Sequence, residues 1–434
     1  MSLQFQFKSL VSLFKKNIDL FYKFLNYYIY TILSAVVAFG SISYLTHEIN
    51  ESGYGHLGIF TSISFVIPNL LSFNTAALVQ INIVNLAYGK YIVFRNNYIT
   101  FCTSIFIFFE FIALTFSNLW QEYNSIVHFS LIYGFLLLLS SIHNGELIQR
   151  GKATQFGLLN FLSATLSLLI SIILISIFHF EWEGRILSFI SVEVLFLIIR
   201  FTALSDIWKK FKITLHIIEW KYFLKYGSML WLGLIAGWII NQSDRFILLR
   251  YLTIEDVGIY SAGAGISGFL IMINTTMVKV LAPIIYKALK EKRNKDFILK
   301  FFVFYAVLIF IIALVICAFT LLFLPYFFGE KYLIAKWIIC ILTMAQAFFG
   351  MYQIVGLVID YLKLNNLKSI IVSICAISCL ITGITLIPFF GINAPAIGNL
   401  ISFILLAFLT YYFANKHLVR LSKVESSYNG ENIN

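Results

Sequence analysis

Carboxyl groups inside apolar runs are the residues of this sequence best placed to do chemistry. Glu110 is flanked by phenylalanines within the run 98–118, and Glu193 lies within the run 186–204. A carboxyl group among apolar residues must face a cavity, find a partner or stay protonated. We therefore expect Glu110 and Glu193 to bind a proton or cation, to contact a ligand or to line a cavity. Packing of a neutral carboxyl group is the alternative for each.

Two cations and one further acid stand near the ends of apolar runs. Arg245 follows Asp244 just beyond the run 222–242, where the two either face a cavity or form a local ion pair. Lys279 lies about twenty residues into the run 259–282. There its amine either meets a charged ligand at the mouth of a cavity or extends to the lipid headgroups.

Two glutamine side chains share one face of an expected helix. Gln346 and Gln353 are seven residues apart, a spacing that places both on the same side. They either hydrogen-bond a ligand or hold neighbouring helices together.

Motifs of catalysis and metal binding are missing from the sequence. It has no glycine-rich phosphate loop, no nucleophile elbow and no His, Cys or carboxylate grouping with metal-ligand spacing. The five cysteines lie in apolar runs and are interpreted as packing residues. We expect no catalytic residue, no metal and no cofactor.

The elements that must hold these side chains are membrane-spanning helices. Of the 434 residues, 60% are hydrophobic and 12% are charged, against about a quarter charged in a soluble domain. Runs of some twenty apolar residues can each cross a hydrocarbon core about 30 Å thick. The first run is too long for a signal peptide, and Pro68 predicts a kink in the second. The sequence predicts an all-α polytopic membrane protein with about twelve spans, near 24–45, 58–79, 98–118, 126–142, 156–178, 186–204, 222–242, 259–282, 298–324, 334–359, 368–387 and 391–414.

The basic residues give these helices an orientation. If the N-terminus is inside, inner segments hold 26 of the 31 Lys and Arg residues. This positive-inside asymmetry predicts both ends of the chain in the cytoplasm, because one missed helix would invert every later loop. The net charge of +11 therefore faces the anionic inner leaflet, and we expect no nucleic acid partner.

Two short patterns recur between the halves of the chain. FLNY at 24–27 recurs as FLKY at 223–226, and LGIF at 57–60 recurs as VGIY at 257–260. The offsets are 199 and 200 residues, so one inserted residue reconciles them. Both matches fall at equivalent places, the entry to the first helix of a half and the start of its second.

Duplication of this kind predicts two six-helix lobes, 1–212 and 213–434, as pseudo-repeats around a central cavity. With six helices in each half the repeat is parallel, an architecture of transporters. The segment 1–22 before the first span is either an amphipathic helix in the cytoplasmic interface or a hydrophobic lead-in.

The segment WIINQSDRFIL at 238–248, followed by EDVGIYSA at 255–262, resembles the Wzx-type polysaccharide flippases. In that family a DRFIL element ends the seventh helix and a VGxY element opens the eighth. The family is part of the multidrug/oligosaccharidyl-lipid/polysaccharide exporter superfamily. The resemblance in span count, halves and loop charge covers the whole chain, and the sharp motif covers about 25 residues.

This resemblance implies movement of an undecaprenyl-diphosphate-linked oligosaccharide, such as an O-antigen unit for lipopolysaccharide, from the inner to the outer leaflet of the bacterial cytoplasmic membrane. The guanidinium fork of Arg245 would bind diphosphate oxygens in pairs, together with Lys279. Gln346 and Gln353 would contact sugars, while Glu110, Glu193 and Asp244 would couple transport or line the cavity. Expected partners are the lipid-linked oligosaccharide, membrane lipids, a polysaccharide polymerase and a chain-length regulator.

Two other classes of protein compete with this interpretation. A drug or metabolite exporter of the same superfamily would share the architecture, but a site for organic cations favours lone carboxylates over Arg and Lys. A membrane-embedded polysaccharide polymerase or ligase has similar aromatic helices and usually displays a long outer loop carrying Arg and His. No such loop is visible in the sequence.

Overall fold

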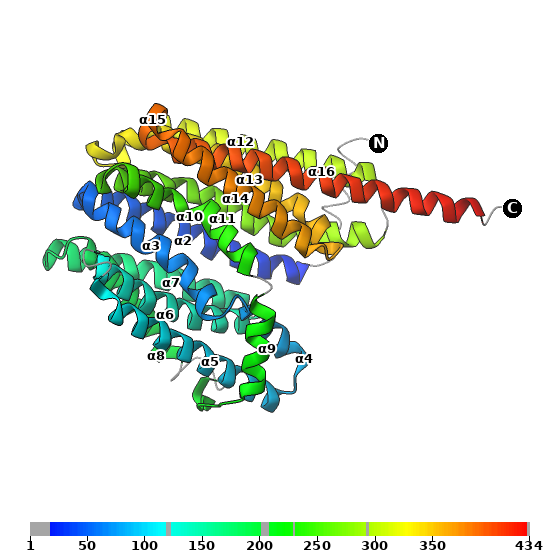
Figure 1. Ribbon diagram of the computed structural model, residues 1–434, viewed down its shortest axis with the longest axis horizontal. Helices are drawn as coiled ribbons and strands as arrows, with labels where there is room; N and C mark the ends of the chain where they lie inside the picture. Colours follow the sequence, from blue (N-terminus) through cyan, green and yellow to red (C-terminus); the bar gives the residue numbers. More distant parts are fainter. Residues whose placement is uncertain (1–17, 119–122, 201–207, 229–230, 292–294, 432–434) are drawn as a thin grey trace. The chain divides into compact units, whose positions relative to one another are not determined.

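The computed structural model describes residues 18–118, 123–200, 208–228, 231–291 and 295–431, and these are helical, with no strand among them (Figure 1). In the first half the helices are α2 (Ile18–Glu48), α3 (Glu51–Leu71), α4 (Ala76–Asn85), α5 (Tyr88–Thr115), α6 (Asn124–Gln149), α7 (Ala153–Ile172), its π-helical continuation η2 (Ile173–Ile177) and α8 (Trp182–Ile199). Most of the segment 1–22 lies outside the described residues, so its amphipathic character stays a prediction.

The second half continues the helical pattern. After the 3-10 turn η4 (Trp208–Lys210) come α9 (Ile217–Ser228), α10 (Trp231–Tyr251), α11 (Ile254–Lys290), α12 (Lys295–Phe327), η5 (Glu330–Ala335), α13 (Lys336–Tyr361), α14 (Asn365–Thr385), α15 (Ile387–Phe390), η6 (Gly391–Asn393) and α16 (Ala394–Glu431).

The predicted spans correspond to these helices one by one. Within the described ranges, ten helices are long and apolar enough to cross a membrane alone, and α9 with α10, bent by 59°, makes an eleventh if the two together count as one span. Helix α8, at the place of the sixth predicted span, is not among these helices, because its eighteen residues include the charged Glu183, Arg185 and Glu193. The described part of the chain thus has ten or eleven candidate spans, and a twelfth stays a prediction. The all-α polytopic prediction is confirmed.

The second predicted span is broken as well as kinked. Pro68 lies inside α3, which ends three residues later. Phe73 and Asn74 then adopt left-handed backbone angles, with φ of 49° and 56°, before α4 begins. Backbone hydrogen bonds from Asn74 N to Asn69 O (2.7 Å) and from Thr75 N to Ser72 O (3.0 Å) satisfy the groups that the break frees.

The helices pack into two compact units. The first unit holds the described parts of Met1–Ser41 and of Ile63–Ser228, and the second holds Ile42–Ser62 with the described parts of Met229–Asn434. The hairpin between α2 and α3 thus packs with the second half of the chain. The predicted lobe boundary at 212 stays a prediction.

A buried polar network closes the first unit at one end. Glu146 accepts hydrogen bonds from the Tyr91 hydroxyl (2.6 Å) and from Trp208 Nε1 (2.9 Å), and Arg95 Nη1 lies 3.6 Å from it. These four side chains are buried, so their polar groups need partners inside the protein. The network fixes η4 against α5 and α6.

Helix α9 is held on the same unit by one asparagine. Asn97 in α5 accepts hydrogen bonds from His216 N (3.0 Å) and Trp220 Nε1 (2.9 Å), and its amide donates to Glu219 Oε2 (2.5 Å). The connection that leads out of the first half is therefore a structured part of the first unit.

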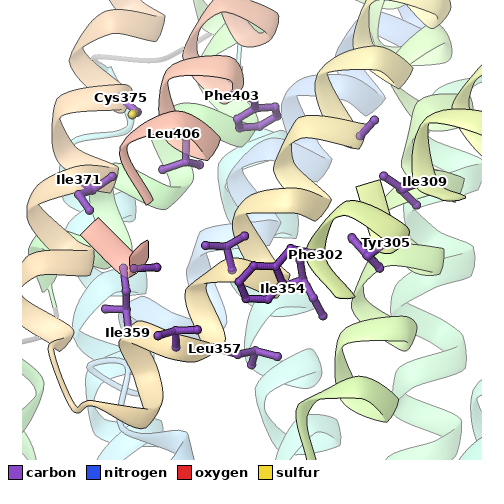
Figure 2. Packing of buried hydrophobic residues seen from close by; sticks show 14 of the residues in the cluster. Phe302, Tyr305, Ile309, Ile354, Leu357, Ile359, Ile371, Cys375, Phe403 and Leu406 are labelled. Atoms are coloured by element: carbon purple, nitrogen blue, oxygen red, sulfur yellow. The ribbon is translucent and has the colours of Figure 1, made fainter. Parts of the chain in front are cut away.

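The core of the second unit is apolar and centred on α13, which packs against α11, α12 and α16. Figure 2 shows this core: Phe302, Tyr305 and Ile309 come from α12, Ile354, Leu357 and Ile359 from α13, Ile371 and Cys375 from α14, and Phe403 and Leu406 from α16. Close packing of this kind, rather than hydrophobic burial from water, holds helices together within a membrane.

Within the second unit, each of the two repeated glycines packs against the helix that carries the other. A Cβ atom on Gly58 in α3 would collide with Ser261 in α11, and a Cβ atom on Gly258 would collide with the Glu51 carbonyl group. Both glycines belong to the recurring pattern LGIF/VGIY. Small residues at such places let two helix backbones approach closely, so the pattern has a packing role.

Candidate functional site

A polar cavity of about 320 Å³ lies inside the first unit between α3, α6, α7 and α8. Its apolar lining is Pro68, Leu137 and Leu159, and its polar lining is Ser140, Ser141, Asn144, Asn160, Ser163, Glu193 and Arg200. Ionisable and hydrogen-bonding groups inside a membrane bundle are costly and mark pathways for substrates or ions. We treat this cavity as the first candidate site.

Helical spacing brings these polar groups to one place. Residues three, four or seven positions apart share a face of a helix. The cavity is therefore lined by Ser140 and Asn144 of α6, by Asn160 and Ser163 of α7, and by Glu193 of α8 with Arg200, which directly follows α8.

The centre of the cavity wall is an ion pair bridged by a hydroxyl group. Arg200 Nη1 lies 3.7 Å from Glu193 Oε2, and both residues are buried. The Ser140 hydroxyl donates to Glu193 and accepts from Arg200, while the Ser163 hydroxyl lies 3.5 Å from the other carboxylate oxygen. The two hydroxyl groups and Arg200 therefore hold the carboxylate in one orientation at the cavity.

Arg200 was not among the residues expected at a site. Its charge lies near the inner end of the sixth predicted span, 186–204, and counts among the inner basic residues. Only its seven-residue spacing from Glu193 could have placed it in the cavity. For Glu193 itself the structure supplies the partner that a buried carboxylate needs. Its coupling role stays a prediction.

Glu110 has a partner on the next helix of the first unit. His128 Nδ1 in α6 lies 2.7 Å from Glu110 Oε2, and the two side chains are 20% and 18% exposed. With Nδ1 protonated, the imidazole donates a hydrogen bond to the carboxylate. Helix α5 begins ten residues earlier than the predicted run and ends at Thr115. Glu110 therefore lies about 7 Å from the end of its helix rather than at its middle.

Asp244 and Arg245 form an ion pair. Both lie inside α10 rather than beyond its end, because the helix continues to Tyr251. Arg245 Nη1 donates to both Asp244 oxygens, at 2.7 and 2.9 Å, and to the Asn241 carbonyl at 3.2 Å. The guanidinium lies 5.5 Å from the centre of the Tyr260 ring. Asn399 in α16 donates to Asp244 Oδ2 at 3.4 Å. This geometry is that of a local ion pair, one of the two arrangements expected from the sequence. Binding of diphosphate by Arg245 stays a prediction.

The remaining candidates are not gathered with this pair. Lys279 is exposed on α11, eleven residues before its end. Gln346 is buried in α13 and Gln353 is half-buried. Their Oε1 atoms are buried, and neither has a hydrogen-bond partner among the described residues.

The sequence matches a known family over most of its length. Residues 22–289 match the family described as polysaccharide biosynthesis protein. The chain belongs to this family. No curated protein matches it significantly.

Solved structures of the same fold are membrane transporters. An inward-facing multidrug resistance MATE family transporter of the MOP superfamily has a TM-score of 0.65 at 15% identity, covering 90% of this chain and 96% of that one. The lipid II flippase MurJ, inward closed, has a TM-score of 0.63 at 14% identity, covering 91% and 89%. A mutant of the Vibrio cholerae MATE transporter VcmN has a TM-score of 0.58 at 16% identity, covering 95% and 98%.

These likenesses show the fold and leave the cargo open. The chain is a multi-pass membrane protein of the polysaccharide biosynthesis family, and its fold is similar to that of the MATE and MurJ structures. The family resemblance drawn from the segment 238–262 is confirmed at this level.

Proposed function

We propose that this protein is a flippase. It moves an undecaprenyl-diphosphate-linked oligosaccharide, such as an O-antigen unit, from the inner to the outer leaflet of the bacterial cytoplasmic membrane by alternating access, with both chain ends in the cytoplasm. The observation that carries this proposal is membership of the polysaccharide biosynthesis family on a fold that includes a lipid II flippase.

The physical problem is to carry a charged, hydroxylated headgroup through hydrocarbon. An unpaired charge there costs at least several kcal/mol, while the lipid tail can stay in the bilayer. Lys279 is exposed and can neutralise diphosphate, and Arg245 is the second cation proposed for it. The amides of Gln346 and Gln353 would replace the water lost from the sugars.

Coupling is assigned to the carboxylates of the first unit. Protonation of Glu193 would leave Arg200 without its counter-charge, so uptake and release of a proton changes the balance of a buried site. Glu110 with His128 is the second group that can exchange a proton.

The ion pairs favour a flippase over an exporter of organic cations. All three predicted carboxylates have a partner side chain within 4 Å: Glu193 has the cation Arg200, Asp244 has the cation Arg245, and Glu110 has the imidazole of His128. An organic cation is attracted by a carboxylate that has no partner. None of these three positions offers such a carboxylate.

The connections between helices argue against a polysaccharide polymerase or ligase. At the ends assigned to the outer side, the segments between successive helices are short, from two residues at 252–253 to eight at 116–123 and 328–335. A long outer loop with Arg and His has no room there. A polymerase and a chain-length regulator remain predicted partners.

Reconstitution tests the proposal directly. The purified chain would be placed in liposomes with a fluorescent undecaprenyl-diphosphate oligosaccharide, and movement between leaflets followed by quenching with an impermeant reductant. We expect faster movement than in empty liposomes, and loss of it in Glu193→Gln at equal protein content. Movement no faster than in empty liposomes, together with uptake of tetraphenylphosphonium, would identify an exporter instead.

A further inference from the structure

The second unit encloses a cavity of about 350 Å³ between α10, α13, α14 and α16, which we call the α10–α14 cavity. None of the candidate residues from the sequence lines it. A cavity of about 150 Å³ accommodates a benzene ring. The α10–α14 cavity therefore has room for a six-membered ring with its substituents.

One side of the cavity is bare helix backbone. Gly233, Gly237 and Asn241 follow one another at four-residue intervals on α10 and all line the cavity. A Cβ atom on Gly237 would meet nothing within 4 Å, and one on Gly233 would meet only Ser369, at 3.3 Å. The two glycines therefore leave open space rather than a tight helix contact.

The facing side carries aromatic and aliphatic surface. Phe349 and Tyr352 of α13 line the cavity, with ring centres 5.5 Å apart. Ile240, Val372 and Leu406 add aliphatic surface. Such walls suit the C–H faces of a ring, because an apolar surface gains by covering another apolar surface.

Polar groups of both kinds stand at the rim. Lys368 Nζ donates to both oxygens of Asp360 at 2.8 Å and lies 5.7 Å from the centre of the Tyr352 ring. The two side chains are 29% and 32% exposed, so each keeps capacity for a ligand. Ser369 adds a hydroxyl group, and the Asn241 amide nitrogen donates to the Gly237 carbonyl at 2.8 Å. That bond turns the Asn241 side chain along its own helix and keeps its oxygen as an acceptor.

The charges of this cavity select its ligand. Asp360 and Lys368 cancel, so the lining has no excess charge to hold a diphosphate or an organic cation. It offers donors and acceptors beside apolar ring faces, which is the complement of a neutral ring that carries hydroxyl groups on its edge.

We propose that the α10–α14 cavity is a binding site for one neutral pyranose residue, formed where the glycine face of α10 meets Tyr352 and the Asp360–Lys368 pair. The ligand would be a sugar of the lipid-linked oligosaccharide, so the inference rests on the proposed function and adds to it a site that discriminates between sugars. A site built to hydrogen-bond a hydroxyl group rejects ligands that lack it, because its polar groups are then left unpaired.

Filling the cavity without removing a polar group is the sharpest test. Gly237→Leu places a side chain in the open space, and Gly237→Ala occupies little of it. Gly89→Leu is the matched control, because Gly89 is an exposed helical glycine of the first unit with nothing within 4 Å of an added Cβ atom. Thermal unfolding in detergent verifies that all three variants fold.

Binding is measured on the full chain in nanodiscs by saturation-transfer NMR. The probes are the methyl glycosides of a hexose, an N-acetylhexosamine and a 6-deoxyhexose, with inorganic phosphate and tetraphenylphosphonium as charged comparisons. We expect at least one glycoside to bind, Gly237→Leu to weaken it at least about tenfold, and Gly237→Ala and Gly89→Leu to retain it. Binding of no glycoside, or equal binding by Gly237→Leu, overturns the proposal, as does displacement of the glycoside by phosphate.

The two proposals fail in different ways. If the glycoside binds and Gly237→Leu abolishes binding, but lipid-linked oligosaccharide does not move in liposomes, the flippase proposal fails and the sugar site stands. If the oligosaccharide moves equally fast with wild type and Gly237→Leu, the flippase stands and the sugar site fails.

Discussion

At the scale of residues, the ion pairs differ in how they are assembled. Asp244 and Arg245 are neighbours in the chain, Glu193 and Arg200 are two helical turns apart, and the third pair joins two different helices. A pair within one helix persists when that helix moves as a rigid body. A pair between helices breaks when they separate, which is the property needed of a switch.

The Glu193–Arg200 pair predicts an asymmetric response to mutation. Arg200→Met leaves a buried carboxylate without its partner and should destabilise the protein by about 3–5 kcal/mol. The double variant Glu193→Gln/Arg200→Met removes both charges and should recover most of that loss. Unfolding temperatures in detergent measure both effects. A double variant as unstable as Arg200→Met would show that the pair is not the source of the stability.

Mutations of Asp244 and Arg245 can distinguish a substrate contact from a purely structural ion pair. Arg245→Ala should abolish polysaccharide export, and Arg245→Lys should impair it, because lysine keeps the charge and loses the fork. Loss of a charge-assisted contact costs about 1.5–3 kcal/mol, or roughly 10- to 150-fold in affinity. Export by complementation, at matched protein levels, is the measurement. Recovery of export in Asp244→Ala/Arg245→Ala would assign the pair to structure and remove Arg245 from the substrate site.

The Glu110–His128 pair predicts non-additive effects. If the two side chains share one proton, Glu110→Gln and His128→Ala should reduce transport by similar factors, and the double variant should be no worse than either. Proton-driven transport in liposomes is the measurement. Multiplied losses in the double variant would mean that the two residues act separately.

Sequence reasoning could find the acids of these sites but not all of their partners. Glu110 and Glu193 stand out because each is the one acidic residue in its apolar run. His128 could not be paired with Glu110, since their contact depends on the rotation of α6 against α5, which a nearly uniform apolar surface does not encode. The α10–α14 cavity was missed for a similar reason: glycines that leave space and glycines that permit contact look the same in a sequence.

At the scale of elements, helix existence was predictable and helix ends were not. The predicted run 98–118 begins ten residues after the start of α5, and the predicted run 222–242 ends nine residues before the end of α10. Polar residues such as Arg95 and Asp244 ended the apolar runs in the sequence, yet buried partners let the helices continue past them. Tertiary pairing therefore decided these boundaries.

The repeated glycines predict a strong effect from one added side chain. Gly258→Leu would drive its side chain into the Glu51 carbonyl group and should separate α3 from α11. We expect reduced accumulation in membranes and a lower unfolding temperature. Gly268→Leu is the control on the same helix, because a Cβ atom there meets nothing within 4 Å. Equal stability of the two variants would deny the close helix contact.

At the scale of the whole molecule, each half of the chain encloses a polar cavity with an acid–base pair. In the first unit the sixth predicted span supplies both Glu193 and Arg200, whereas in the second unit Asp360 follows the tenth predicted span and Lys368 begins the eleventh. The two pairs therefore do not occupy equivalent helices, and the repeat that is visible as two short patterns in the sequence does not extend to them. The two cavities differ in lining, hydroxyls and amides in one and aromatic rings in the other, so we assign coupling to the first and sugar binding to the second.

Topology is the property on which both assignments depend, because it decides which leaflet each cavity can serve. Inner segments hold 26 of 31 basic residues if the N-terminus is cytoplasmic, and such an excess orients membrane proteins. Reporter fusions at Lys212 and Lys292 should therefore report cytoplasm, and fusions at Ser52 and Asn393 the outer side. Lys212 is the decisive position, since it lies between the sixth and seventh predicted spans. An outer signal there would mean an odd number of spans in the first half, would break the parallel repeat, and would place the α10–α14 cavity at the opposite end of the membrane from the leaflet where its substrate is made.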